Sequence, residues 1–285
     1  MFKDIKRIVV IAGCQRSGTT LVGQILGAHP DALMLDEPDG LYEWFNAEIR
    51  ESPHAKNLLY KLINQSKSKY RSEHQKILSD AAGNPIGNLN LTHLILKAPN
   101  LTYNYKELPI LNIPVSIIYP VRDPRSVVAS MLKLKHIPMV ENQIKLIRQN
   151  KELMVRFRDE LTLLEDSEVR LYAKMALIWR IKTALYDRFL ECGLPTFVFK
   201  YEDLINETEK TVVNIAQHAG LRFDDLMMSH EIVYKGFGPG MTDRSRPIDN
   251  LSIDSWIENL NEEQDKEILR IAGKLAEKFN YSKRI

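Results

Sequence analysis

The stretch 13–20, GCQRSGTT, has the spacing of a loop that binds phosphate. Its two glycines are five residues apart, and the hydroxyls of Thr19 and Thr20 follow the second glycine. A helix that begins after such a loop presents unpaired backbone N–H groups and the positive end of its dipole, and both attract anions. Arg16 adds a guanidinium fork that suits phosphate or sulfate oxygens. The stretch therefore predicts an anion-binding site. The alternative is a simple strand–turn–helix connection that binds no ligand, because it can have the same residue pattern.

This loop lacks the lysine of a nucleotide-hydrolysing loop. In such loops the lysine reaches the β- and γ-phosphates, and the hydroxyl after it holds magnesium. Here Thr19 occupies the lysine position, and the next long apolar run ends in Lys97 rather than in a magnesium-binding aspartate. Both features favour a ligand with fewer phosphates and no essential metal. A P-loop kinase that acts on a small molecule is the alternative, because the glycine frame is the same.

A second set of polar residues lies at 122–130, RDPRSVVAS. Arg122 ends an apolar run, and Ser130 follows eight residues later on the helix expected after Pro124. Because the first of these residues form a turn, both side chains can converge on one phosphate near the start of the helix. Arg125, in between, is expected to be a solvated helix residue.

Together the two segments resemble the nucleotide motifs of sulfotransferases that use 3′-phosphoadenosine 5′-phosphosulfate (PAPS). The run RSGTT at 16–20, with His29-Pro30 downstream, is similar to that family's 5′-phosphosulfate loop, except that Gln15 replaces the usual proline. The segment 122–130 resembles the family's 3′-phosphate motif. The resemblance implies PAPS as co-substrate, PAP as product and no metal. The residues that it assigns to nucleotide binding are Arg16, Ser17, Gly18, Thr19, Thr20, Arg122 and Ser130.

The resemblance also implies a catalytic base. A branch of the family that includes protein-tyrosine sulfotransferases uses a glutamate after the first helix and second strand, and the matching residue here is Glu37 in the segment DEPDG. Asp36 and Asp39 fit that position less well. Taken without the resemblance, DEPDG reads as an acidic turn that faces solvent. Another branch uses a histidine in a K-T-H segment, but the matching segment here reads KAP.

Lys97 is the second catalytic candidate. It ends a buried strand, so its ammonium is expected at the carboxyl edge of the sheet, where ligands gather in open α/β folds. We expect it to stabilise the charge of the departing phosphate, a role that Arg16 would share. An exposed residue at a strand end is the competing interpretation.

Two further assignments rest on the same resemblance. Tyr201, in the segment FKYEDL, resembles a residue that flanks the adenine in some relatives, although a core tyrosine is nearly as good an interpretation. Arg246 resembles the basic residue of a C-terminal loop that closes over the nucleotide, with an ordinary surface arginine as the alternative. The glycines of the segment 235–250 fit a mobile lid.

Strands and helices must alternate to position these residues. Apolar runs predict four strands, at Arg7–Ala12, Leu91–Leu96, Pro114–Tyr119 and Pro195–Phe199, and Ala32–Leu35 could be a further short strand. Helical patterns begin at Gly18 and Pro124 and are also seen at 41–82, 139–165, 168–192, 208–219 and 261–278. The alternation predicts an α/β fold with a mainly parallel central sheet flanked by helices, as in P-loop NTPase-like sulfotransferases. With no repeat or linker, we expect one sulfotransferase domain over residues 1–285.

Composition limits the partners and the compartment. A net charge of +2 in 285 residues argues against nucleic acid as a partner. Cys14 and Cys192 are too few for a disulfide framework, and no apolar run approaches the length of a membrane span, so we expect a cytoplasmic protein. By elimination, the acceptor is expected to be a small molecule (a metabolite, lipid or sugar) with a hydroxyl or amine. A non-catalytic binder of a nucleotide or sulfated ligand is a further alternative. The long helices could pair in a homodimer.

Overall fold

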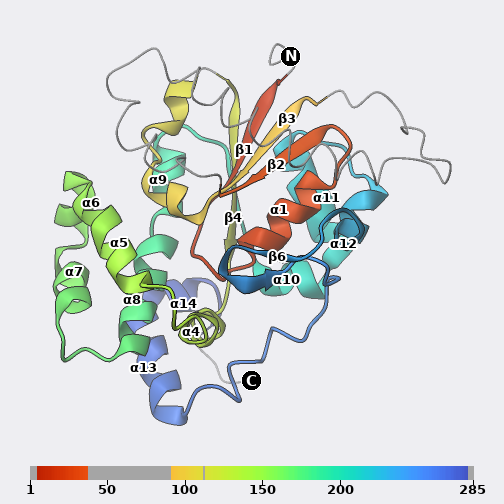
Figure 1. Cartoon of the computed structure of the whole chain (residues 1–285). Coiled ribbons are helices and arrows are strands. Elements are labelled where there is room, and N and C mark those ends of the chain that lie inside the picture. The colour runs from red at the N-terminus through yellow and green to blue at the C-terminus, as the bar shows by residue number, and fades with distance from the viewer. Residues whose placement is uncertain (1–4, 38–90, 112, 282–285) are drawn as a thin grey trace.

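A five-stranded parallel sheet lies at the centre of the structure, a computed structural model that describes residues 5–37, 91–111 and 113–281. The order is β2-β3-β1-β4-β5, and every neighbouring pair is parallel (Figure 1). The predicted α/β class with a mainly parallel sheet is confirmed. The strands are β1 (Arg7–Ile11), β2 (Ala32–Asp36), β3 (His93–Lys97), β4 (Val115–Val121) and β5 (Thr196–Lys200).

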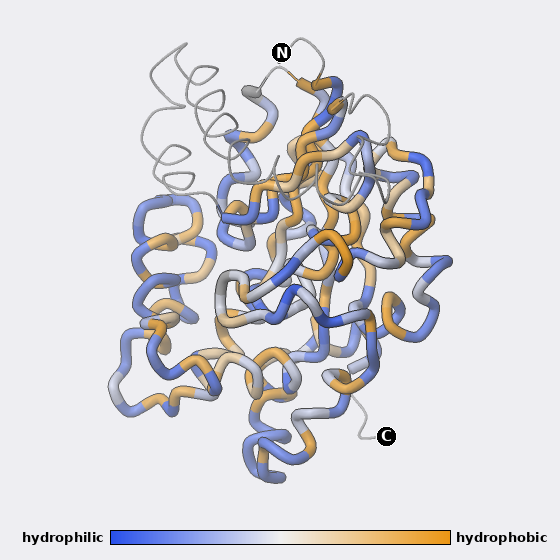
Figure 2. Tube along the Cα trace, turned by 45° about the vertical axis from the view of Figure 1, so that its right-hand side comes forward, coloured by the Kyte–Doolittle hydropathy of each residue, from blue (hydrophilic) through white to orange (hydrophobic). Residues whose placement is uncertain are grey.

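Helices cover both faces of this sheet, which is why the strands read as continuous apolar runs. In β1, Ile8 and Val10 belong to one hydrophobic cluster and Val9 and Ile11 to the other, because successive side chains point to opposite faces. The hydropathy colours of Figure 2 show apolar strands inside and more polar helices outside. One face carries α1 (Thr19–Gly27) and α11 (Thr208–Ala219), and the other carries α4 (Pro124–Leu132) and α8 (Leu171–Thr183).

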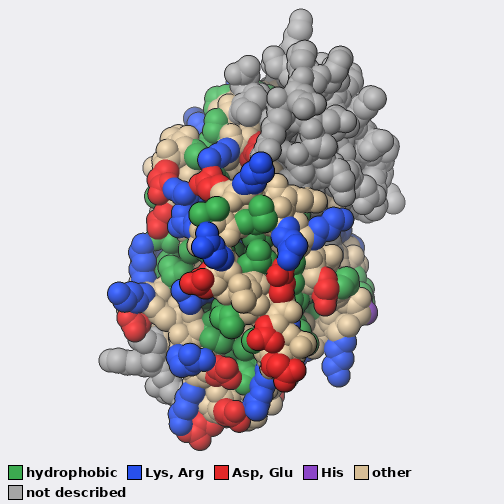
Figure 3. Space-filling model, turned by 90° about the vertical axis from the view of Figure 1, so that its left-hand side faces the viewer, with side chains coloured by type: hydrophobic (Ala, Val, Ile, Leu, Met, Phe, Trp, Pro, Cys, Tyr) green, Lys and Arg blue, Asp and Glu red, His purple; other side chains and the backbone are tan. Residues whose placement is uncertain are grey.

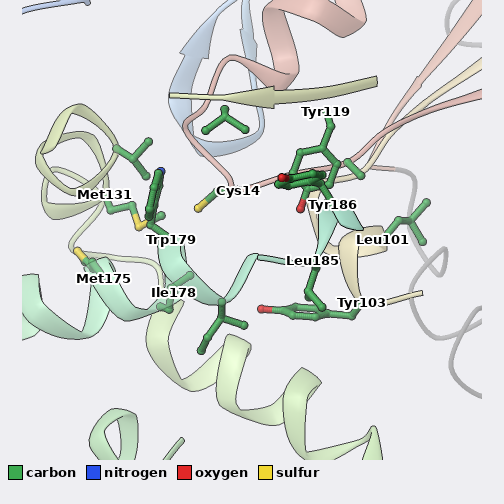
Figure 4. Close-up of a cluster of buried hydrophobic side chains, with 14 of the residues drawn as sticks. Cys14, Leu101, Tyr103, Tyr119, Met131, Met175, Ile178, Trp179, Leu185 and Tyr186 are labelled. Atoms are coloured by element: carbon green, nitrogen blue, oxygen red, sulfur yellow. The ribbon is translucent and has the colours of Figure 1, made fainter. Parts of the chain in front are cut away.

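The larger cluster packs against the loop at residues 13–18, which is the predicted anion-binding loop, because Cys14 of this loop belongs to the cluster. Figure 4 shows Cys14 projecting from that loop toward Trp179, with Tyr186 on its other side. The indole Nε1 of Trp179 donates a hydrogen bond of 2.8 Å to the carbonyl oxygen of Arg122. The core therefore fixes both the loop after β1 and the end of β4.

The long helices predicted in the second half of the chain are interrupted. Asn150 ends the first and caps the next, because its side chain accepts from the backbone N–H groups of Glu152 and Leu153. Gly273, with φ of 54°, separates the last two. The predictions of single helices at 139–165, 168–192 and 261–278 were therefore wrong. The observed helices are α5 (Met139–Arg148), α6 (Lys151–Arg156), α7 (Arg158–Glu165), α9 (Tyr186–Glu191), α13 (Glu262–Ala272) and α14 (Lys274–Lys278).

The face formed by α5, α6 and α7 carries both charge signs. Figure 3 shows Lys and Arg side chains interspersed with Asp and Glu over this face. Several of the charges pair with each other, such as Arg148 with Glu165 at 2.7 Å. The face thus has no single-sign field of the kind that binds a polyanion.

Short elements complete the described part of the chain. Within the described ranges no helix is both long and apolar enough to cross a membrane. The predicted helices at 41–82, and Asp39, lie outside the described residues. The short helices and 3₁₀ segments are η1 (Pro99–Tyr103), η2 (Leu108–Leu111), α10 (Tyr201–Asn206), η3 (Asp225–Ser229), α12 (His230–Val233) and η4 (Pro239–Met241), and β6 (Phe237–Gly238) pairs antiparallel with β7 (Thr242–Asp243).

Candidate functional site

The predicted site residues gather at the carboxyl edge of the sheet. Arg16 lies in the loop after β1, Glu37 and Lys97 at the ends of β2 and β3, and Arg122 and Tyr201 after β4 and β5. In the strand register Asp36 lies beside Lys97, which also lies beside Ile11 of β1. Parallel strands bring such residues to one edge, and this edge is where ligands bind in open α/β sheets.

The loop after β1 is held in shape by a threonine from η1 and by left-handed backbone. Gly13 N donates to Thr102 Oγ1 at 2.7 Å, and the same hydroxyl donates to Gly13 O at 3.2 Å. Arg16 and Gly18 have φ of 67° and 88°, and Gly18 is the N-cap of α1. The first turn of α1 follows directly, and its residues Thr19 and Thr20 help to line the cavity described below.

Gly18→Ala is expected to destabilise the fold through two effects. An alanine at φ of 88° costs roughly 1–2 kcal/mol. In addition, its Cβ would lie 2.4 Å from Cδ2 of Tyr201, and such overpacking adds about 1–3 kcal/mol. Gly193→Ala is the matched control, because Gly193 has φ of 74° and its added Cβ would meet no atom within 4 Å. Thermal unfolding measures the stability of both variants. Equal losses of stability would show that Tyr201 does not obstruct a side chain at position 18.

The two predicted anion motifs meet in one place. Arg16 Nε donates to Ser130 Oγ at 2.9 Å, and Arg122 Nη1 donates to the carbonyl oxygen of Arg16 at 3.2 Å. The guanidinium of Arg122 lies over the ring of Tyr201, 4.5 Å from its centroid. Burial, and secondarily the positive charge of Arg122, lowers the pKa of Arg16. A half-buried guanidinium beside the buried guanidinium of Arg122 is suited to an anionic ligand, which would offset the repulsion between the two positive charges.

A cavity of about 300 Å³ opens at this point. Its walls combine the start of α1 with Arg122, Tyr201 and the later segment 241–252. The volume is at the lower end of the range for small-ligand pockets. Among the predicted site residues, the cavity is lined by Arg16, Gly18, Thr19, Thr20, Arg122, Tyr201 and Arg246. Ser17 is fully buried beneath it, and its hydroxyl has no partner among the described residues.

Residues 236–253, which we call the strap, cross over the cavity. Arg16 Nη1 donates to Gly240 O at 3.1 Å and to Thr242 Oγ1 at 3.0 Å. Arg122 Nη2 donates to the carbonyl oxygen of Ser252, whose hydroxyl lies 2.9 Å from Tyr201 Oη. The strap therefore bonds directly to both of the arginines expected to bind phosphate.

Two arginines of the strap have different positions. Arg246, predicted from the sequence, is partly exposed and pairs with Asp249, and that hydrogen bond raises its pKa. Arg244, which the sequence analysis did not select, reaches back to pair with Asp36 at the end of β2. Gln24 of α1 also donates to the carbonyl oxygen of Arg244 at 3.2 Å. The strap thus contacts the acidic end of β2 as well as the cavity.

Glu37 and Lys97 are brought together. Lys97 Nζ donates to Glu37 Oε1 at 2.5 Å and forms an ion pair of 3.1 Å with Asp36 Oδ1. The side chain of Lys97 is 2% exposed and that of Glu37 is 25% exposed, so the ammonium is buried while the carboxylate is still accessible. Glu37 follows β2 with φ of 46°. The structure therefore places an accessible carboxylate beside a buried cation at the sheet edge, rather than on a solvated turn.

Arg125 is not a solvated helix residue, so that prediction was wrong. It is 3% exposed and pairs with Asp123 at 2.6 Å and Asp265 at 3.4 Å. Its guanidinium also lies over Trp256, 4.0 Å from the ring centroid. Its partners anchor the start of α4 to α13, so its contribution is structural.

Lys182 of α8 is a buried ammonium that the sequence analysis overlooked. It is fully buried and donates to Gln15 Oε1 and Asn100 Oδ1, each at 2.9 Å. Burial lowers its pKa to about 8, and nearby Cys14 and Glu37 oppose that shift. Burial also raises the pKa of the Cys14 thiol to about 12. Cys14 is therefore an unreactive core residue, as its packing in Figure 4 also indicates.

Comparison with known proteins identified a family and solved structures with a similar fold. A family model described as "Sulfotransferase family" matches residues 9–225, more than half of the chain. The chain is similar to the sulfotransferase domain from the Synechococcus PCC 7002 olefin synthase, at 20% identity over 96% of this chain and 95% of that one, with a TM-score of 0.55. It is also similar to the sulfotransferase domain from the curacin biosynthetic pathway, at 19% identity over 95% and 98%, with a TM-score of 0.51. No curated protein matched.

Proposed function

The chain belongs to the sulfotransferase family, and from that premise we propose that it moves the sulfuryl group of PAPS to a hydroxyl or amine of a small-molecule acceptor. The observation that carries the proposal is that Arg16 and Arg122 line one cavity at the sheet edge, where Arg16 also donates to Ser130. The family match favours this function over the small-molecule kinase. We further propose that one domain over residues 1–285 performs it, in the cytoplasm.

The nucleotide is proposed to bind in the cavity beneath the strap. The phosphosulfate would contact the N–H groups and hydroxyls at the start of α1 together with Arg16, and the 3′-phosphate would contact Arg122 and Ser130. Tyr201, whose ring lies against the guanidinium of Arg122, would flank the adenosine. Arg246 of the strap would contact the nucleotide from the side of the cavity that faces solvent. The residues proposed to bind nucleotide are Arg16, Ser17, Gly18, Thr19, Thr20, Arg122, Ser130, Tyr201 and Arg246.

Transfer is proposed to follow an in-line displacement. An acceptor oxygen or nitrogen attacks the sulfur and loses its proton to Glu37, while the bond between sulfur and the bridging phosphate oxygen breaks. The electron pair of that bond stays on the phosphate, so PAP leaves with an added negative charge. Lys97 and Arg16 would stabilise this charge as it develops. The buried position of Lys97 strengthens that interaction, because little water screens it.

Titration calorimetry with adenosine 3′,5′-bisphosphate and transfer of labelled sulfate from PAPS to a panel of alcohols and amines test this function. We expect saturable binding and sulfated product without added metal. A protein that takes up no bisphosphate at high micromolar concentration would contradict the proposal. Magnesium-dependent ATP turnover would instead support the kinase.

Arg122→Met is expected to weaken bisphosphate binding roughly 10- to 100-fold, which corresponds to the 1.5–3 kcal/mol of hydrogen bonds to a charged group. The methionine keeps much of the side-chain volume over Tyr201 but removes the guanidinium. Arg158→Met is the matched control, because Arg158 is exposed on α7 and lines no part of the cavity. Calorimetry measures both variants. Equal affinity in the two would show that Arg122 does not hold a phosphate.

A further inference from the structure

Four charged side chains form a continuous cluster at the carboxyl ends of β2 and β3. Lys97 Nζ lies 2.5 Å from Glu37 Oε1 and 3.1 Å from Asp36 Oδ1. Arg244 of the strap donates to Oδ2, the other carboxylate oxygen of Asp36. The cluster therefore runs in the order Arg244, Asp36, Lys97, Glu37, and each neighbouring pair is an ion pair.

Asp36 is the stronger competitor for the ammonium of Lys97. Its side chain is fully buried, whereas that of Glu37 is still accessible to water. A carboxylate removed from water is unfavourable unless cations compensate it, so Asp36 by itself would draw Lys97 away from Glu37. Arg244 supplies a second cation for Asp36. The four side chains then carry two charges of each sign, and Lys97 can pair with both carboxylates.

Arg244 also fixes the orientation of the Asp36 carboxylate. Because Arg244 holds Oδ2, the oxygen that faces Lys97 is Oδ1. The last side-chain torsion of an aspartate has only a broad preference, so a carboxylate held through one oxygen can rotate. With both oxygens held, Asp36 keeps Nζ of Lys97 at a defined point between itself and Glu37.

The strap holds Arg244 through its backbone. Arg244 N donates to the carbonyl oxygen of Gly236 at 2.8 Å, and the carbonyl oxygen of Arg244 accepts from Gln24 Nε2 at 3.2 Å. Gln24 is buried on α1, the helix that follows the predicted anion-binding loop. The position of the Arg244 guanidinium therefore depends on the docking of the strap against α1.

Arg244 is directed toward Asp36 and not toward the nucleotide cavity. Its neighbour Asp243 lines that cavity, as does Arg246, but Arg244 does not. Its guanidinium instead reaches the end of β2. The loss of this side chain is therefore expected to change the rate of transfer and not the affinity for nucleotide.

We propose that Arg244 is a positioning residue for sulfuryl transfer: through Asp36 it aligns Lys97 with Glu37, so that both are in place only when the strap is docked. This inference rests on the function proposed above. Without Arg244, Lys97 would shift toward the buried carboxylate of Asp36 and away from Glu37. Such a shift is costly, because a displacement of about 1 Å can slow a reaction about 100-fold.

Replacing the arginine itself is the first test. Arg244→Met removes the guanidinium, Arg244→Lys keeps a cation, and Arg148→Met is the matched control, because Arg148 forms an exposed ion pair on α5. Single-turnover transfer from saturating labelled PAPS is measured together with bisphosphate affinity and thermal unfolding. We expect transfer by Arg244→Met to be about 10- to 100-fold slower, with the affinity of the wild type, and Arg244→Lys to have an intermediate rate.

A double variant tests whether Arg244 acts through Asp36. Asp36→Asn is nearly isosteric and removes the charge that Arg244 compensates. If the two residues act as one unit, Asp36→Asn combined with Arg244→Met should transfer no more slowly than the slower single variant. Losses that multiply in the double variant would show that Arg244 acts by another route, and would overturn the inference.

Gly238→Ala displaces the guanidinium without removing its charge. The added Cβ would lie 2.5 Å from Arg244 Nε, and Gly238 has φ of −97°, in extended backbone that alanine also adopts. We expect a smaller loss of rate than in Arg244→Met, again with unchanged bisphosphate affinity. This variant decides the question if Arg244→Met does not fold, and a wild-type rate would then overturn the inference.

Chemical rescue separates positioning from a purely structural contact. Free guanidinium, at concentrations too low to unfold the protein, should raise the rate of Arg244→Ala but not that of Glu37→Gln, with sodium chloride as the control for ionic strength. A folded Arg244→Met protein with a wild-type rate would overturn the positioning role and leave the sulfotransferase function intact. Failure of the wild type to bind adenosine 3′,5′-bisphosphate would overturn the proposed function, and the positioning role with it.

Discussion

Lys97→Met is expected to slow sulfuryl transfer by about 10²- to 10³-fold, the range found when a pre-positioned donor is removed from a developing negative charge. Lys97 Nζ lies 2.5 Å from Glu37 and 3.1 Å from Asp36, so it sits between the proposed base and the carboxyl end of β2. The rate of the chemical step is measured as single-turnover transfer of the labelled sulfuryl group from PAPS to an acceptor. Bisphosphate affinity should change little, because Lys97 does not line the nucleotide cavity.

The same variant leaves two neighbouring carboxylates without their shared cation. Breaking a buried ion pair from one side costs about 3–5 kcal/mol, so thermal unfolding must accompany the kinetics. Lys97→Arg is the control that retains the charge, and it should keep more of both stability and rate than Lys97→Met. A folded Lys97→Met protein with wild-type turnover would remove Lys97 from the mechanism.

Glu37→Gln is expected to slow transfer about 10²- to 10⁴-fold, because general-base catalysis contributes that much and glutamine cannot take the proton. The substitution keeps the size and an oxygen that Lys97 can bond, so the effect should fall on the rate and not on bisphosphate affinity. Glu258→Gln, at an exposed position, is the matched control. Both are assayed at saturating PAPS.

A smaller variant tests the same role by rescue. Glu37→Ala leaves space beside Lys97, and added formate should restore part of its rate in a concentration-dependent way if a carboxylate is what the step lacks. Unchanged transfer in Glu37→Gln, with the fold intact, would point to another base. Loss of transfer in both Glu37→Gln and Lys97→Met with retained nucleotide binding would exclude a purely non-catalytic binder.

The sequence predicted the sheet because β1 to β4 are almost entirely buried, so that they appear as unbroken apolar runs. The edge strand β5 is only partly buried, but it is also apolar. It also predicted that Arg16, Arg122 and Lys97 lie at the sheet edge, because each follows a predicted strand and parallel strands share a carboxyl edge. Glu37, in contrast, was assigned through the family resemblance. These predictions depend on short-range patterns. Helix ends were less predictable, since one asparagine such as Asn150 can end one helix and cap the next.

Residues whose partners are remote in sequence were misread or missed. Arg125 looked solvated because Asp265, one of its partners, is 140 residues away. Lys182 bonds Gln15 across 167 residues, and Arg244 pairs with Asp36 across 208. Without the fold, a lysine on an amphipathic helix or an arginine in a polar loop gives no sign of such contacts. The only local hint for Arg244 was its place two residues before Arg246 in a glycine-bearing segment.

The bonds between the strap and the two arginines have a thermodynamic consequence for ligand entry. Arg16 already donates to Gly240 and Thr242, and Arg122 donates to Ser252, so arriving phosphates compete with acceptors that are in place. Wherever a phosphate displaces one of these acceptors, the measured binding enthalpy is the difference between the enthalpies of two similar hydrogen bonds. It is not the full enthalpy of a new hydrogen bond. Association would then release less heat than the number of phosphate contacts suggests, and departure of the spent nucleotide would be assisted because the protein re-forms its own bonds as the product leaves.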